Sequence, residues 1–257
     1  MNTKTNSKYI HIGFGKCGSS KLQKDIFPLV AKIKNLKYWG DEFKSLDSER
    51  ENLNKLLLNH VTRMKLGLET NYLNIENNYL ISNEELSSYR DADLINDFSI
   101  KNLKAFGENT HIILIIREPR NWLSSVFIQL CVHEKPLQKP EFFFLNQFEY
   151  SPRLPYQKFN IDKFSYNEVI NAYKNKFNQF TFIKYEKLHE MKAIAEIFNL
   201  DQHDVELFKK KFKKNYVNKA LSKNSVRFLW NFNSFLSIFG LSFINKYSNK
   251  VYLQRSN

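Results

Sequence analysis

The chain has 257 residues, of which 42% are hydrophobic and 15% aromatic, and its formal net charge at pH 7 is +13. This length suffices for one α/β domain with a full core, and the apolar content excludes a disordered chain. No apolar run of about 18 residues is present, so we expect no transmembrane segment. The two cysteines, Cys17 and Cys131, do not suggest a disulfide framework, and the scattered histidines predict no metal site.

The N-terminal region begins with a short polar stretch that does not resemble a signal peptide, so we expect a cytoplasmic protein. A strand over 8–14 follows and ends in a glycine-rich loop, residues 13–20, before a helix. Such a loop exposes backbone N–H groups at a helix start, where the helix dipole favours anions. Lys16 adds a positive charge, and Ser19 and Ser20 add hydroxyl donors. The sequence therefore predicts capture of a phosphate-like group.

Two known loop types compete for this segment. A Walker A loop needs a lysine directly after its last glycine, and Gly18 is followed by Ser19, so that interpretation fails. A dinucleotide-binding fingerprint needs glycines at the spacing of Gly13, Gly15 and Gly18, with an acidic residue about 20 positions further on. Asp41 lies near enough to serve, so an NAD(P)-binding Rossmann protein stays open as an alternative.

Strands and helices alternate along the chain. We expect strands over 8–14, 36–39, 78–82, 111–116 and 180–184, and helices over 19–34, 46–66, 91–106, 119–131, 166–178, 186–199 and 204–214. Pro28 should kink the first helix. Alternating βα units predict a P-loop-like, three-layer α/β fold with a central parallel sheet of about five strands. Its binding crevice should lie at the carboxyl ends of the strands.

Two carboxylates follow the third predicted strand. Glu84 is closer to the strand end, so we expect it to be the general base. Ser82 and Glu85 also have the spacing of a capping box, which would occupy Glu85 and leave Glu84 free. His11 and His133 are the reserve candidates for the general base.

The fourth predicted strand is a continuous apolar run, as expected of a parallel strand buried on both faces. Arg117 follows it directly, and Pro119 suits the first turn of the next helix. A guanidinium donates two hydrogen bonds to a terminal phosphate. The alternative for Arg117 is a surface ion pair with Glu118.

The loop at 15–20 resembles the phosphosulfate-binding loop of sulfotransferases that use 3′-phosphoadenosine 5′-phosphosulfate (PAPS), with Gly15 where that family usually has proline. Arg117 and Ser125, eight residues apart, resemble the family's 3′-phosphate site. Segments 80–87, 183–188 and 218–222 are similar to further parts of that fold. The resemblance implies PAPS as the sulfate donor and Lys16 and Glu84 as catalytic residues. The implied nucleotide-binding residues are Gly15, Lys16, Cys17, Gly18, Ser19, Ser20, Arg117 and Ser125.

Cys17 allows two interpretations. Its position beside Lys16 at a helix start favours a reactive thiolate, whereas a buried thiol there would be an inert filler.

Two regions match no motif. Residues 132–164 are expected to form the acceptor pocket. Residues 225–257 are expected to form an aromatic-rich amphipathic helix and tail, which would pack on the core, on a partner or on a membrane surface. The positive charge fits an anionic nucleotide, an anionic glycan or a membrane surface.

Together these features predict a single domain over 1–257. The expected function is transfer of a sulfuryl group from PAPS to a hydroxyl or amine of a carbohydrate or other small acceptor, such as a glycan or lipid-linked sugar. No metal and no nucleic acid would take part. The oligomeric state stays open. The alternatives are the NAD(P)-binding protein and a non-enzymatic basic protein that binds nucleic acid or a membrane surface.

Overall fold

The structure is a computed structural model that describes residues 7–40, 48–73, 75, 78–87, 94–133, 165–214 and 231. The chain divides into two compact units, residues 1–118 with 163–215, and residues 119–162 with 216–257. The single domain expected over 1–257 stays a prediction. Apart from Asn231, the expected C-terminal helix over 225–257 lies outside the described residues, as does most of 132–164.

The first unit contains a five-stranded sheet in which every strand pair is parallel, with strand order β2-β3-β1-β4-β5. The central strand β1 therefore lies between β3 and β4. The strands are β1 Lys8–His11, β2 Lys37–Gly40, β3 Tyr79–Ser82, β4 His111–Ile116 and β5 Gln179–Lys184. The residues over 112–115 are fully buried, as an all-apolar strand covered on both faces requires.

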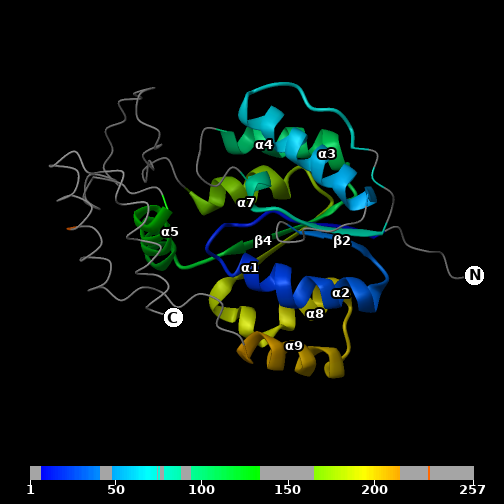
Figure 1. Ribbon diagram of the computed structural model, residues 1–257, viewed down its shortest axis with the longest axis vertical. Coiled ribbons are helices and arrows are strands. Elements are labelled where there is room, and N and C mark those ends of the chain that lie inside the picture. The colour runs from blue at the N-terminus through cyan, green and yellow to red at the C-terminus, as the bar shows by residue number, and fades with distance from the viewer. Residues whose placement is uncertain are drawn as a thin grey trace, which may run out of the picture. The chain divides into compact units, whose positions relative to one another are not determined.

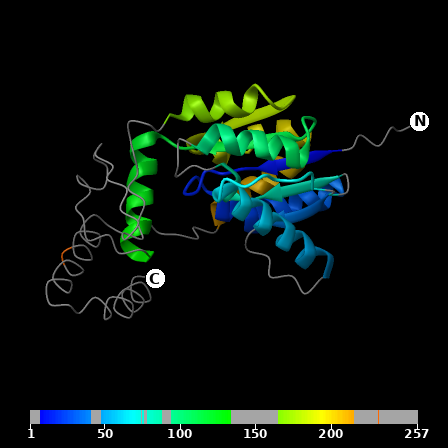
Figure 2. The ribbon, with the colours of Figure 1, turned by 90° about the horizontal axis from the view of Figure 1, so that it is seen from above.

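Helices cover both faces of this sheet. Figure 1 shows α3, α4 and α7 on one face and α1, α2, α8 and α9 on the other. Their bounds are α1 Ser19–Lys21, α2 Phe27–Lys34, α3 Ser48–Lys65, α4 Ile95–Phe106, α7 Tyr166–Lys174, α8 Lys192–Phe198 and α9 Gln202–Lys214. Helix α4 contacts both α3 and α7, and it lies alongside α7 in Figure 2. The predicted three-layer α/β fold class is confirmed.

The first helix changes its winding where Pro28 was expected to kink it. A π-helical turn, η1 (Leu22–Ile26), separates α1 from α2. The Phe27 N–H donates to the Leu22 carbonyl, and Pro28 has no N–H to offer the Gln23 carbonyl. The Tyr38 hydroxyl donates to that carbonyl instead, at 3.0 Å. The break therefore precedes the proline, and a side chain from β2 satisfies the carbonyl that it leaves open.

The helix expected over 186–199 is two helices. The 3₁₀ helix η4 (Tyr185–Glu190) ends at Met191, whose φ of +56° is left-handed, and α8 begins beyond it. The Met191 side chain is buried, so packing holds a backbone conformation that non-glycine residues rarely adopt. Local sequence gave no signal for this break.

The described part of the second unit is α5 (Pro119–His133), apart from Asn231. Pro119 is its first residue, as predicted. The Ser124 hydroxyl donates to the Arg120 carbonyl at 2.8 Å, within the helix. Across all the described ranges, no helix combines the length and the apolar character needed to cross a membrane.

Candidate functional site at the carboxyl edge of the sheet

The segments that follow β1, β3 and β4 meet at one edge of the sheet. Asn83 N–H donates to the His11 carbonyl at 3.0 Å, which joins the ends of β3 and β1. On the other side, Phe14 N–H donates to the Ile115 carbonyl at 2.8 Å, which joins the loop after β1 to β4. The glycine loop is therefore held between the residues after β3 and the residues after β4.

Glycine is required at both ends of this loop. Gly13 has a φ of +107°, and a Cβ there would lie 3.3 Å from the Glu84 Cα atom. Gly18 has a φ of +82°, and a Cβ there would lie 2.8 Å from the Tyr185 ring. Lys16, between them, also has a left-handed φ of +65°. The loop thus approaches the β3 end at Gly13 and the β5 end at Gly18.

Backbone donors gather where the helix begins. Gly18, Ser19 and Ser20 are the residues at the start of α1, where N–H groups have no partner within a helix. Among the described residues, none accepts a hydrogen bond from these three N–H groups. The helical run that they start extends through η1 and α2 to Lys34. This arrangement suits an anion.

The Ser19 hydroxyl does not take part as the sequence suggested. It is buried and donates to the Phe14 carbonyl at 3.0 Å, so it braces the loop from within. Ser19 still contributes its backbone N–H. The Ser20 side chain is half-buried.

Cys17 is fully buried. Burial raises the pKa of its thiol far above the ordinary value, the Glu84 carboxylate raises it further, and the Arg117 guanidinium acts in the opposite direction. The thiol therefore stays protonated at neutral pH. These features support the inert filler rather than the reactive thiolate. The Cys131 side chain lies outside the described residues.

The two carboxylates after β3 have different surroundings. Both belong to the 3₁₀ turn η2 (Glu84–Ser87). Glu85 pairs with Lys65 of α3 on the exposed side of the turn. Glu84 is half-buried, and its carboxylate interacts electrostatically with Cys17 of the glycine loop. Glu84 is thus close to the glycine loop, while Glu85 is paired with a lysine of α3.

The capping box proposed for this turn does not form. Asn83, not Ser82, caps it, because Asn83 Oδ1 accepts the Glu85 N–H at 2.9 Å. The Ser82 hydroxyl lies 2.7 Å from His11 Nδ1 and accepts from Gln23 Nε2 at 3.0 Å. Its oxygen is therefore occupied in the core.

His11 belongs to that buried cluster. Its side chain is fully buried, and its ring lies 5.3 Å from the ring of Phe27. Burial lowers the pKa of His11 to about 3, so the ring is neutral at physiological pH. These features make it a core residue rather than a base. The side chain of the other reserve candidate, His133, lies outside the described residues.

Arg117, which follows β4, contacts the glycine loop. Its Nη1 donates a long hydrogen bond of 3.5 Å to the Lys16 carbonyl. Its guanidinium also lies 4.9 Å from the centre of the Tyr185 ring, a cation–π contact. The backbone N–H of the neighbouring Glu118 donates to the Glu186 carboxylate at 2.9 Å. Ser125, the expected partner of Arg117, belongs to the other unit, so its role stays a prediction.

Sequence reasoning missed two aromatic residues here. Tyr185, directly after β5, packs its ring against Gly18 and Arg117. Tyr166, at the start of α7, stacks on Phe14 of the loop with ring centres 5.5 Å apart. The similarity of segment 183–188 to part of the sulfotransferase fold was the only sequence signal near these residues, and it did not indicate a role for Tyr185.

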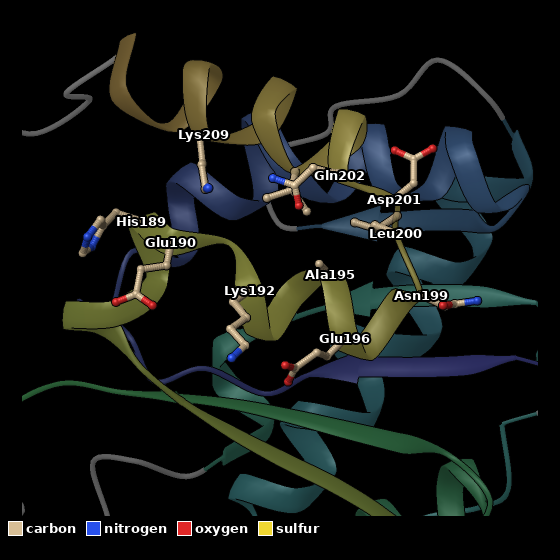
Figure 3. A pocket seen from close by; sticks show the side chains of 11 residues that line it. His189, Glu190, Lys192, Ala195, Glu196, Asn199, Leu200, Asp201, Gln202 and Lys209 are labelled. Carbon is tan, nitrogen blue, oxygen red and sulfur yellow. The ribbon is translucent and has the colours of Figure 1, made fainter.

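A hollow between α8 and α9 lies elsewhere in the same unit (Figure 3). Its lining carries charges of both signs and shares no residue with the three loops described above. Lys209 extends from α9 toward α8, whereas Lys192 and Glu196 extend from α8 on the side away from α9. Because these charges do not converge, we place the candidate site at the strand ends. Within the described ranges, no three His, Cys, Asp or Glu side chains are grouped to hold a metal ion.

No protein-family model matches this chain, and no curated protein sequence does. A solved structure, the sulfotransferase from Alicyclobacillus acidocaldarius, is similar at 11% sequence identity and a TM-score of 0.48. The match covers 94% of this chain and 96% of that one. At that identity and TM-score, the similarity carries no inference about activity, which must come from the chain's own residues.

Proposed function

We propose that this protein is a sulfotransferase that moves a sulfuryl group from PAPS to a hydroxyl or amine of a carbohydrate or other small acceptor. One observation carries the proposal. Helix-start N–H groups after β1, a guanidinium after β4 and a carboxylate after β3 gather at neighbouring strand ends. This arrangement would supply anion donors, a second phosphate ligand and a base around one loop.

The residues present fit a nucleotide with phosphates at both ends of its ribose. The N–H groups of Gly18, Ser19 and Ser20, together with Lys16, would hold the 5′-phosphosulfate. Arg117 would bind the 3′-phosphate, with Ser125 of α5 assisting. In the described part of the chain, the Arg117 guanidinium makes one hydrogen bond, through Nη1, so its remaining donors can serve a phosphate.

The residues also suit the reaction. PAPS would supply the sulfuryl group: a bond from sulfur to the acceptor oxygen, or to nitrogen for an amine, would form, the S–O bond to the 5′-phosphate would break, and adenosine 3′,5′-bisphosphate would leave. Lys16 and the three N–H groups would stabilise the negative charge that grows on the leaving phosphate. Glu84 would take the proton that the acceptor loses.

The strand order argues against the NAD(P)-binding alternative. In a Rossmann fold the second strand lies beside the first, so an acidic residue after it reaches the ribose. Here β2 is at the sheet edge, and β3 separates it from β1. Asp41, directly after β2, lies outside the described residues. At about 5 Å per strand, the end of β2 is about 10 Å from β1, twice the separation in the Rossmann order.

Melting temperatures with three nucleotides test the proposal. At ligand one hundred times above its dissociation constant, binding adds about 2.7 kcal/mol of stability. We expect a clear rise with adenosine 3′,5′-bisphosphate and little with ADP, which lacks the 3′-phosphate, or with NAD. A larger rise with NAD would favour the Rossmann alternative. No rise with any nucleotide would favour the basic binding protein.

The acceptor class, a glycan, lipid-linked sugar or small metabolite, is proposed from the sequence alone. The same holds for the cytoplasmic location and for peripheral contact with a membrane.

A further inference from the structure

A single backbone carbonyl, that of Leu86 in η2, accepts two buried side-chain hydrogen bonds. Tyr173 Oη of α7 donates at 2.7 Å, and Asn102 Nδ2 of α4 donates at 2.8 Å. Asn102 Nδ2 also donates to Tyr173 Oη at 2.8 Å, so the three groups form a closed triangle. Both side chains are buried, at 1% exposure for Asn102 and none for Tyr173. We name this arrangement the carbonyl clamp.

The clamp is braced from a third helix. His60 Nε2 of α3 lies 3.0 Å from Asn102 Oδ1. An amide oxygen can only accept, so His60 Nε2 is the donor. Burial lowers the pKa of His60, which keeps the ring neutral and suited to this role. A buried polar network in which Asn102 is fully satisfied is rigid, and it is costly to disrupt.

The turn that the clamp holds also carries Glu84. Leu86 is two residues beyond Glu84, and the Ser87 hydroxyl closes the turn by donating to the Glu84 carbonyl at 3.0 Å. The other end of the turn is anchored through the Asn83 N–H to β1, as described above. Gly13 packs against the Glu84 Cα atom on the loop side. Glu84 thus lies between two anchored points, and the clamp is the one on its C-terminal side.

We infer that Asn102 and Tyr173 are positioning residues that set the location of the Glu84 carboxylate relative to the glycine loop. The inference rests on the proposed function, which makes Glu84 the base. A base must lie within hydrogen-bond reach of the proton it removes, and a misplacement of about 1 Å can cost about a hundredfold in rate. Neither side chain needs to touch a substrate for this role.

The test compares Tyr173→Phe with Thr110→Val. Each change removes one buried hydroxyl, and the Thr110 hydroxyl donates to the Phe106 carbonyl at 2.9 Å. Thr110 directly precedes β4, so it lies at the amino edge of the sheet, away from the site. Three quantities are measured at a temperature where both variants are folded. They are turnover of PAPS with the best acceptor in a panel of sugars and phenols, affinity for adenosine 3′,5′-bisphosphate, and amide hydrogen exchange in a peptide over 83–87.

We expect Tyr173→Phe to lower turnover at least tenfold, to leave nucleotide affinity within twofold, and to speed exchange over 83–87 at least tenfold. Thr110→Val should change none of the three by as much as twofold. Unchanged exchange over 83–87 in Tyr173→Phe would overturn the clamp. Faster exchange with unchanged turnover would overturn its role in positioning Glu84. If the unmodified protein transfers no sulfuryl group, the proposed function fails, and the exchange experiment still decides whether the clamp holds the turn.

Discussion

Replacing Gly18 by alanine tests how tightly the glycine loop and the β5 end are packed together. The new Cβ would lie 2.8 Å from Tyr185 Cε2 and 3.2 Å from Cδ2, so the ring must move. That ring also carries the cation–π contact with Arg117. One methyl group therefore perturbs the helix start, the aromatic ring and the proposed 3′-phosphate ligand together.

The cost has two parts. An alanine held at a left-handed φ loses about 1–2 kcal/mol. Displacement of a packed ring adds about 1–3 kcal/mol. The sum, about 2–5 kcal/mol, corresponds to a fall in melting temperature of roughly 5–15 °C for a unit of this size.

Gly67→Ala is the matched control. Gly67 has a φ of +68°, but a Cβ there would meet nothing within 4 Å. We expect Gly67→Ala to lose only the stability that a left-handed φ costs an alanine, about 1–2 kcal/mol, and to keep its affinity for adenosine 3′,5′-bisphosphate. Gly18→Ala should lose more stability and at least tenfold in affinity. Denaturant unfolding and a binding titration measure both. Equal losses in the two variants would refute the packing argument.

Four further predictions concern single residues. Glu84→Gln should keep nucleotide affinity and lose roughly two to four orders of magnitude in turnover. Glu85→Gln should keep turnover and lower the free energy of unfolding by about 1 kcal/mol or less, because its partner Lys65 is exposed. Similar turnover in both variants would contradict this assignment. Arg117→Ala should mainly weaken nucleotide binding, whereas Lys16→Ala should lower turnover as well, because the charge that Lys16 meets grows in the transition state. The same pattern of affinity and turnover in both variants would refute the division of roles. Cys17, a buried thiol with a raised pKa, should resist alkylation in the folded protein at pH 8, and rapid labelling without unfolding would show otherwise. His11 has a pKa of about 3 in the folded protein against 6.5 when unfolded, so its contribution to stability is complete above pH 6.5 and is lost as the pH falls toward 3. If the unfolding free energy of a His11→Gln variant falls as steeply with decreasing pH as that of the unmodified protein, the assignment is contradicted.

The parts of the fold that the sequence predicted well depend on near neighbours. The apolar run over 112–115 could be assigned to a buried strand because burial on both faces removes the alternation of polar residues. The glycine loop could be recognised because Gly13 and Gly18 have conformations that favour glycine. Pro28 predicted a kink because it lacks an N–H, and the structure has a π-helical turn just before it.

The features that the sequence did not predict depend on distant contacts. Ser82 had the right spacing for a cap, but its hydroxyl is taken by His11 and Gln23, which are 71 and 59 residues away in the chain. Tyr185 contacts Gly18 only because β5 folds beside β4. The thiolate interpretation of Cys17 followed from its sequence neighbours, which say nothing about burial. In each case the deciding contact is set by strand order and packing.

A crystal structure of the complex with adenosine 3′,5′-bisphosphate tests the central claim most directly. We expect the 5′-phosphate at the N–H groups of Gly18, Ser19 and Ser20, with Lys16 beside it. The 3′-phosphate should lie on the Arg117 guanidinium, and Glu84 should lie beside the space that the sulfuryl group would occupy. A nucleotide bound elsewhere, such as in the hollow between α8 and α9, or bound with its 3′-phosphate away from Arg117, would contradict it.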